Sequence, residues 1–355
     1  GLKYALTILN VGRAISIPAI CLGMAKQAWQ PTLDHANARQ TFQKPLSERQ
    51  TQRIRLSRMA VNLFTMEALA SSVWRMADQH SYDVRIEAAI AKIFCSEKTI
   101  QFLKDAQIIF GGMGYETADS KRVRGEPAFG IEQLVRDAEM YRIGEGATDI
   151  LRPFVAREGV SPHLDRVQRY MNGEMNRGER LVELFKLVRI YALWYMNLWW
   201  RRALPDRTEF HHPKVAHLLG YVEHASRRLA GAIFWAMVRH GEQLRDDQGR
   251  QTRIETVGED LLTITTGALW ASSQERANAD EQVWELVEHF AADAQVRIDR
   301  AISELRGYNG DDIPTTIGQH TVEGNYAGLS HGIIPRGLRD YLPAGVGGRH
   351  RHLAK

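Results

Sequence analysis

The chain has 355 residues, of which 44% are apolar and 25% are charged, a balance typical of globular proteins and a length that fits two domains. The net charge is +4, yet Lys and Arg alternate with acids along the chain, which indicates solvated helix surfaces and argues against a nucleic-acid partner. No uncharged apolar run approaches the roughly 20 residues of a membrane span. The two cysteines, Cys21 and Cys95, lie inside apolar helical patterns and indicate reduced core thiols of an intracellular protein.

Apolar residues recur at helical spacing from the first residues onward. Because the chain begins with Gly1 inside such a pattern, we expect it to be part of a longer polypeptide. The spacing predicts helices over residues 4–30, 46–79, 84–110, 131–144 and 147–158. Gly111 and Gly112 form a natural helix stop, and the polar segment 116–130 predicts a loop.

The second half of the chain predicts more helix. Residues 161–180 contain Pro162 and the two glycines Gly173 and Gly178, and they are the predicted linker. A second helical domain is expected over residues 181–310, and the Gly-rich residues 311–355 predict an irregular tail. Runs with strand-like alternation are nearly missing, so the predicted fold class is all-α.

One acid stands out among few chemical signals. The sequence lacks a Walker loop, zinc-ligand spacing, a GxSxG motif and a dinucleotide fingerprint. His211 and His212 have no ligand partner at helical spacing, so we expect no metal site. Glu145, in contrast, stands between Gly144 and Gly146, and a carboxylate on such a connection can approach a bound molecule without side-chain crowding. The simpler interpretation makes it a solvent-exposed turn residue.

Four motifs occur in order along the first 160 residues. They are NVGR at 10–13, ARQTFQKPLSERQ at 38–50, IIFGGMGY at 108–115 and RIGEGATDILR at 142–152. Together they resemble the C-terminal half of the acyl-CoA dehydrogenases, with similarity from Gly1 to about Gly159. Residues 215–240 resemble, more loosely, the additional C-terminal region of the long-chain and very-long-chain branch.

The resemblance implies a four-helix bundle over residues 1–160 and a specific reaction. The family oxidises an acyl-CoA thioester to the trans-2-enoyl-CoA, in which a carboxylate removes the α-proton while FAD accepts the β-hydrogen as hydride. Glu145 occupies the position of that base. Some branches carry the acid on the first helix of this half, but residues 10–13 here contain no acid, so Glu145 is the one candidate.

The resemblance also implies cofactor and substrate contacts. Arg39 would pair with the pyrophosphate of a FAD bound mainly by the neighbouring subunit, Phe42 would pack near that cofactor, and Gln50 would reach toward its adenosine end. Gly111 and Gly112 would let the backbone approach the ADP moiety. The remaining expected flavin contacts are Ala147, Thr148 and Asp149, and the expected substrate contacts are Asn10, Arg13 and Gly146. Taken singly, each of these residues could instead be a surface charge, a core residue or a helix cap.

The expected partners follow from the same resemblance. They are an acyl-CoA substrate, an electron-transfer flavoprotein as electron acceptor, and a second copy of the chain, because a shared flavin requires a homodimer or a higher homo-oligomer. The sequence departs from the usual pattern at Ile108, where the family has Gln, at Ala147, where it has Thr or Ser, and at Gly144, where it often has an aromatic residue.

The stretch 191–202 is rich in aromatic residues and allows two interpretations. Trp194, Trp199 and Trp200, flanked by arginines, could form an interfacial belt on a membrane surface, or they could fill a core or a subunit interface. We expect a cytoplasmic protein in a bacterium or a mitochondrial one in a eukaryote, with or without membrane association.

Two rival functions remain beside the enzyme. The chain lacks the N-terminal helical and β domains of the family, so we expect it to be inactive alone. It could also be a non-catalytic half-site subunit completed by a separate chain, or a helical membrane-docking or assembly module that retains the fold.

Overall fold

The computed structural model describes residues 8–79, 83–171, 212–276, 282–307 and 310–330, together with residues 182, 186 and 189. It divides into a compact unit of residues 1–307 and a second unit of residues 308–355. The all-α prediction is confirmed: within the described residues, the strands are those of one short hairpin.

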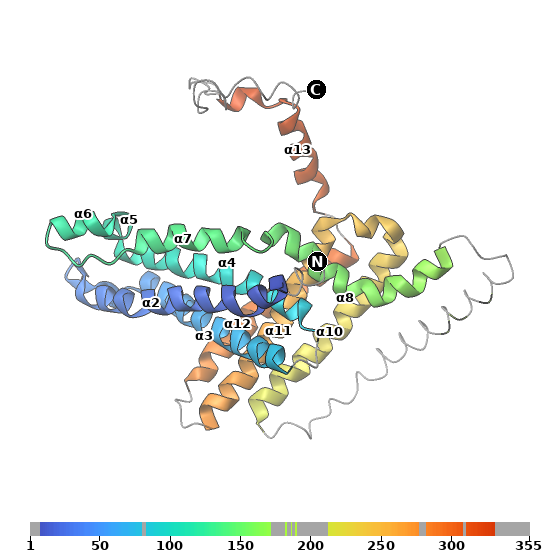
Figure 1. The fold of residues 1–355 in the computed structure, drawn as a ribbon, viewed down its shortest axis with the longest axis horizontal. Coiled ribbons are helices and arrows are strands. Elements are labelled where there is room, and N and C mark those ends of the chain that lie inside the picture. The colour runs from blue at the N-terminus through green and yellow to red at the C-terminus, as the bar shows by residue number, and fades with distance from the viewer. Residues whose placement is uncertain are drawn as a thin grey trace. The chain divides into compact units, whose positions relative to one another are not determined.

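The first bundle is built around a central helix (Figure 1). A short π-helix, η1 (Gly12–Ser16), leads into α2 (Ile17–Ala38), and α3 (Gln50–Asp78), α4 (Arg85–Phe110), α7 (Ile131–Ile143) and α8 (Thr148–Met171) follow. Helix α4 packs against α2, α3, α7 and α8. It is buried on all sides from Ala88 to Ser96 and exposes one face nearer its C-terminal end, at Gln101, Lys104 and Ile108.

Side-chain contacts show how these helices run relative to one another. Thr99 donates to the Cys21 carbonyl (3.2 Å), and His35 stacks on Phe110, so α2 and α4 run parallel. Helix α7 runs the opposite way, because Lys92, near the start of α4, contacts Arg142 at the end of α7. The N-terminal ends of α2 and α4 therefore meet the connection between α7 and α8.

A hairpin joins α2 to α3 at the other end of the bundle. Strand β1 (Gln40–Thr41) pairs antiparallel with β2 (Lys44–Pro45), and the 3-10 turn η2 (Leu46–Glu48) leads into α3. Phe42 and Gln43 at the tip have φ of 47° and 65°, the conformation of a tight two-residue hairpin turn. This turn leaves the Phe42 side chain in solvent.

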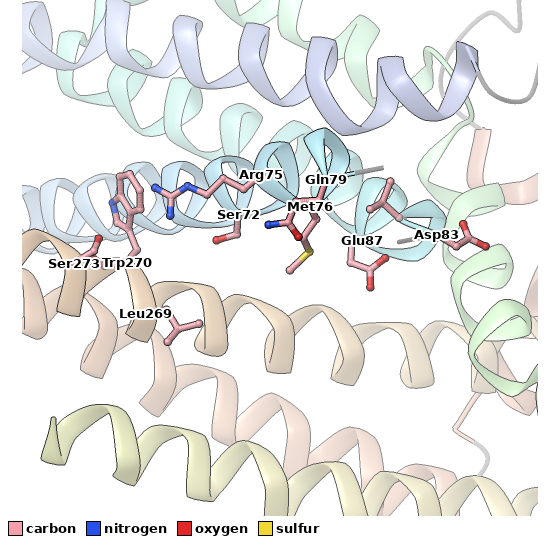
Figure 2. A pocket seen from close by; sticks show the side chains of 10 residues that line it. Ser72, Arg75, Met76, Gln79, Asp83, Glu87, Leu269, Trp270 and Ser273 are labelled. Carbon is pink, nitrogen blue, oxygen red and sulfur yellow. The ribbon is translucent and has the colours of Figure 1, made fainter. Parts of the chain in front are cut away.

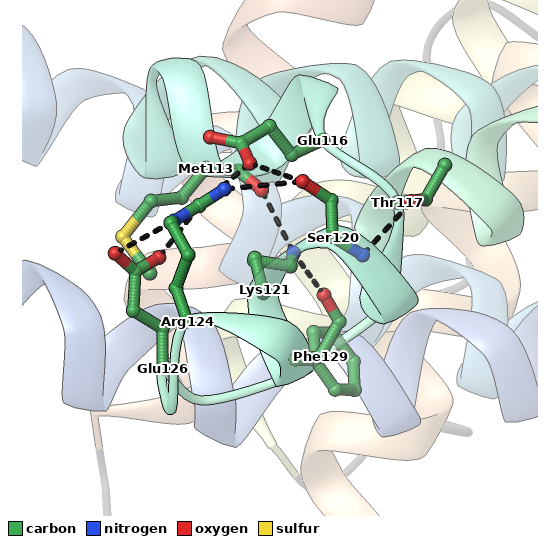
Figure 3. Close-up of polar contacts among 8 residues, drawn as sticks. All are labelled: Met113, Glu116, Thr117, Ser120, Lys121, Arg124, Glu126 and Phe129. Atoms are coloured by element: carbon green, nitrogen blue, oxygen red, sulfur yellow. Dashed lines mark hydrogen bonds and ion pairs between the residues drawn. The ribbon is translucent and has the colours of Figure 1, made fainter.

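The segment expected as a loop, 116–130, contains a helix. Helix α5 (Gly112–Tyr115) is followed by α6 (Ala118–Val123), whose N-cap Thr117 accepts a hydrogen bond from the Ser120 amide. Figure 3 shows that the Nζ of Lys121 donates to the carbonyls of Met113 (2.8 Å) and Phe129 (2.5 Å). The loop prediction was wrong for α6 because a polar sequence with a good N-cap forms a helix once a buried lysine on it bonds to the segments before and after it.

The second helical block packs directly on the first bundle. It consists of α10 (Pro213–His240), the 3-10 helix η4 (Gly241–Arg245), α11 (Gln248–Arg276) and α12 (Val283–Arg306). Helix α11 contacts α10 and α12 and also α3 and α8, which explains why residues 1–307 form one compact unit. Helix α8 continues to Met171, through residues 161–171 of the expected linker.

The second unit is described by itself. Helix α13 (Asp312–Val322) and the short 3-10 helix η5 (Ala327–Ser330) occupy part of the segment for which we expected irregular structure. The aromatic stretch 191–202, with Trp194, Trp199 and Trp200, lies outside the described residues.

One helical stretch within the described residues, Ile8–Ala38, is long and apolar enough to cross a membrane by length and composition. Core helices pass the same test. Cys21, Ala25 and Ala28 on this stretch are fully buried in the bundle.

Helix α11 carries buried carboxylates against the first bundle. Glu255 is fully buried and pairs with Arg152 of α8, while Asp260 pairs with Arg297 of α12 (2.6 Å). Burial and the neighbouring Glu259 charge raise the pKa of Glu255 to about 9, and burial also raises the pKa of Glu259. The folded protein therefore holds a proton on the Glu255–Glu259 pair at neutral pH.

This proton makes the stability of the fold depend on pH. The unfolded chain releases it near the ordinary glutamate pKa, so between that pH and about 9 the folded state binds more protons, and the free energy of unfolding falls as pH rises. Glu255→Gln keeps the protonated shape without the titration. We expect its melting temperature to exceed that of the parent by a margin that grows from pH 5 to pH 9.

The control is Glu304→Gln. Hydrogen bonds from Arg253 and Arg300 lower the pKa of Glu304, so its contribution is present above the unfolded-state pKa and is lost only in acid. Glu304→Gln should lose stability by a constant amount from pH 5 to pH 9. An equally constant difference for Glu255→Gln would contradict the buried-proton interpretation.

Candidate functional site

Glu145 lies on a constrained connection between α7 and α8. It has φ of 56°, and the following Gly146 has φ of 111°. Positive φ is uncommon for a residue with a side chain. It costs of order 1–3 kcal/mol and persists only where the surrounding structure holds it in place. Glu145 is half-buried, so it is more than a freely solvated turn residue.

The Glu145 carboxylate packs against the backbone of Gly12. A Cβ built on Gly12 would lie 2.2 Å from both carboxylate oxygens, a distance that real atoms do not adopt. Gly12 is buried and opens the π-helix η1, a helix type frequent at functional sites. Only glycine at this position leaves the carboxylate where it is.

One oxygen of Glu145 lacks a protein partner. Among the described residues, no hydrogen-bond donor reaches its buried Oε2. Such groups are rare in folded proteins, because leaving a buried acceptor unpaired costs about 1–3 kcal/mol. A buried, unpaired carboxylate oxygen is available to take a proton from a bound molecule.

Arg13 holds the backbone of Glu145 rather than its carboxylate. Its Nε donates to the Glu145 carbonyl oxygen at 2.8 Å. Burial lowers the pKa of Arg13, an effect that the nearby Glu145 charge opposes. A Cβ on Gly146 would come within 3.3 Å of the Arg13 guanidinium and 3.1 Å of Leu151, so this glycine also fits a crowded place. Asn10 lies half-buried on the same helical stretch as Arg13.

Two residues of α4 that the sequence reasoning missed support the same connection. Lys92 is fully buried and donates to the carbonyls of Arg142 (2.9 Å) and Gly146 (2.7 Å). Glu97 accepts hydrogen bonds from the Nε of Arg142 (3.0 Å) and the hydroxyl of Thr148 (3.1 Å). The sequence did contain a signal for the burial of Lys92, because this lysine stands inside an otherwise apolar run.

The residues expected to contact flavin fall into two groups. Ala147 directly precedes α8, Thr148 and Asp149 begin it, and the Thr148 hydroxyl donates to Glu97. The others lie at the hairpin end of the bundle: Arg39, Phe42, Gln50, Gly111 and Gly112 are all exposed there. Helix α2, with 22 residues, separates the two groups by about 33 Å of helix length.

The hairpin-end group presents an open surface. The Phe42 side chain is 93% exposed, and the Arg49 guanidinium lies 5.8 Å from its ring centroid. Gly111 has φ of 62°, and no atom lies near a Cβ built on Gly111 or Gly112, so a ligand could approach this backbone closely.

A separate cleft lies on the α3–α11 side of the bundle. It has a volume of about 570 Å³, and Figure 2 shows Trp270 beside Arg75, whose guanidinium lies 5.5 Å from the indole centroid. None of the site residues expected from the sequence lines it. Within the described residues, no cluster of three metal-ligating side chains occurs.

Comparisons with known proteins agree with the motifs. Residues 1–160 match the family described as acyl-CoA dehydrogenase, C-terminal domain. The chain is 34% identical over 336 residues to the probable acyl-CoA dehydrogenase FadE10 of Mycobacterium tuberculosis, covering 94% of this chain and 51% of that protein. It is 38% identical over 159 residues to the mitochondrial very long-chain specific acyl-CoA dehydrogenase of Mus musculus, covering 45% of this chain and 23% of that protein.

A solved structure extends the similarity to the fold of both helical blocks. The acyl-CoA dehydrogenase of Bacillus anthracis, complexed with FAD, aligns with a TM-score of 0.63 at 21% identity, over 90% of this chain and 52% of that chain. The chain thus spans about half the length of the FadE10 proteins that it matches. The match of residues 1–160 to the C-terminal domain of this family confirms the resemblance of the four motifs.

Proposed function

We propose that this chain is the C-terminal helical portion of a FAD-dependent acyl-CoA dehydrogenase in which Glu145 is the general base. The observation that carries the proposal is the buried, unpaired Oε2 of Glu145, on a connection that three other side chains hold in place. An α-proton next to a thioester is weakly acidic, so the base must be well placed and poorly solvated. Glu145 meets both requirements.

FAD, when bound, would accept the hydrogen that leaves the β-carbon as hydride. Arg39, Phe42, Gln50, Gly111 and Gly112 fit the peripheral part of a flavin site, because an exposed arginine and open glycine backbone suit a pyrophosphate. Ala147, Thr148 and Asp149 would border the flavin beside Glu145.

The separation of the two groups supports a symmetric oligomer. Because about 33 Å of helix lies between them, we propose that each chain contributes Glu145 to one flavin and its hairpin to the flavin of a neighbour. Such reciprocal use requires an isologous contact, so a homodimer is the smallest assembly that completes the site.

The finer assignments rest on the named relatives. Similarity to the very long-chain enzyme of Mus musculus supports a long-chain acyl-CoA substrate in fatty-acid β-oxidation, with Asn10, Arg13 and Gly146 on the substrate side. An electron-transfer flavoprotein would reoxidise the flavin. The protein would work in the bacterial cytoplasm or, in a eukaryote, in mitochondria; membrane contact through Trp194, Trp199 and Trp200 stays a prediction.

Anaerobic mixing tests the activity. The intact protein, purified with its flavin, should lose flavin absorbance within seconds of mixing with a saturated long-chain acyl-CoA and more slowly with a butyryl thioester. A protein without flavin, or one whose flavin stays oxidised with every thioester, would contradict the proposal and favour the half-site or docking functions.

The exposed hairpin gives an independent prediction. Phe42→Ala should lower the flavin bound per chain several-fold, because Phe42 packs on little of its own chain and would instead cover the neighbour's cofactor. The melting temperature of the flavin-free protein should stay unchanged. Val238→Ala on α10, another exposed apolar side chain (61%), is the control and should retain full flavin content. Equal flavin in both variants would contradict the role of the hairpin.

A further inference from the structure

Lys92 is a buried cation that donates hydrogen bonds to the backbone on both sides of Glu145. Its side chain has no exposed surface, and its Nζ donates to the carbonyls of Arg142 and Gly146, three residues before and one residue after the acid. A single ammonium group near the start of α4 thus ties both ends of the short connection to the central helix.

Stability does not explain this residue. Burying a charge costs several kcal/mol unless good ion pairing offsets it. Among the described residues, no carboxylate forms an ion pair with Lys92, and burial lowers its pKa to about 8. An apolar side chain of similar length would avoid this charge burial but would leave the Arg142 and Gly146 carbonyls without their donor, so the benefit of Lys92 lies in what its hydrogen bonds hold.

The connection needs such support because its backbone is strained at Glu145. Glu145 has a positive φ, and a shift to ordinary φ would turn its side chain away from Gly12. Lys92 holds the carbonyls of Arg142 and Gly146 from the inside of the bundle. Glu97, five residues later on α4, fixes Arg142 and Thr148 from the outside.

We propose that Lys92 is a positioning residue for the general base Glu145, with Glu97 as a second support on the same helix. This inference rests on the proposed function, since it assigns a role to Lys92 through Glu145. Lys92 touches neither substrate nor cofactor in this assignment. Its contribution is to hold the carboxylate oxygen at the place where the α-proton will lie.

The test is Lys92→Met in the intact protein, with Lys121→Met as the matched control. Lys121 is equally buried and also donates to two backbone carbonyls, of Met113 and Phe129, but it supports the α6 segment instead of Glu145. Both variants remove a buried ammonium from a pair of carbonyls. A purely structural role predicts that they behave alike.

The readouts are melting temperature, flavin content, KM and the rate of flavin bleaching per bound flavin. We expect Lys92→Met to bleach about a hundred-fold more slowly than the parent with KM nearly unchanged, because a misplacement of about 1 Å has an effect of this size. Lys121→Met should bleach at the parental rate per flavin. Glu97→Ala, which removes a partly exposed side chain, should slow bleaching about ten-fold and serves if Lys92→Met does not fold.

Two outcomes would overturn the inference, and they are distinguishable. If the parent bleaches and both Lys92→Met and Glu97→Ala match its rate per flavin, Lys92 has only a structural role while the proposed function stands. If the parent itself never bleaches with any acyl-CoA, the proposed function fails and the role of Lys92 fails with it.

Discussion

Glu145→Gln is expected to reduce turnover at least a hundred-fold while leaving flavin content and fold nearly intact. Glutamine keeps the size and polarity of glutamate but cannot accept the α-proton. A positioned general base typically contributes on the order of a hundred- to ten-thousand-fold, which sets the size of the loss. The strained backbone should survive, because its supports bond to the carbonyls of Arg142, Glu145 and Gly146 and not to the carboxylate.

The measurement is anaerobic flavin bleaching with a long-chain acyl-CoA, combined with a binding assay. Binding should persist in Glu145→Gln, since uniform contacts with CoA do not depend on this carboxylate. The matched control is Asp137→Asn, which neutralises an exposed acid on the preceding helix α7 and should leave the rate unchanged. If Glu145→Gln bleached as fast as Asp137→Asn, Glu145 would be a turn residue between two glycines.

Local patterns were enough to predict the fold class, and together with the motif resemblance they singled out Glu145 as the candidate acid. Helical spacing located the core helices because α4 and its neighbours bury apolar residues at regular intervals. Gly111, with φ of 62°, ends α4 where the paired glycines predicted a stop. The Gly-flanked Glu145 stood out for the same local reason.

The environment of Glu145 could not be predicted locally, because it is assembled from distant segments. Arg13 reaches the Glu145 carbonyl across 132 residues of sequence, and Lys92 reaches Gly146 across 54. Which residue faces the carboxylate depends on the parallel packing of α2 and α4, and no spacing rule contains that information. Helix α6 was missed for a related reason. Lysine is usually a surface residue, but Lys121 is buried, and its hydrogen bonds hold the segments before and after α6.

Gly12 is the residue whose role only the structure reveals, and it carries the second large prediction. Gly12→Ala should lower turnover about ten- to hundred-fold with little change in stability. Gly12 has a helical conformation in η1, and alanine favours a helix over glycine by about 1 kcal/mol, so the backbone should accept the new methyl group. The atoms in its way are the carboxylate oxygens of Glu145, 2.2 Å from the new Cβ.

These oxygens are the free end of a flexible side chain, so the carboxylate will move while the fold stays. The displacement needed to restore a normal contact exceeds 1 Å, enough to cost about a hundred-fold when a base must meet a C–H bond in line. Gly23→Ala is the matched control: it makes the same substitution on the adjoining helix α2, where no atom lies near the built Cβ. Bleaching rates and melting temperatures of the two variants, measured side by side, separate a displaced base from a general effect of alanine. Equal bleaching rates would mean that the carboxylate reaches the substrate from another position, and Gly12 would then be only a point of close helix packing.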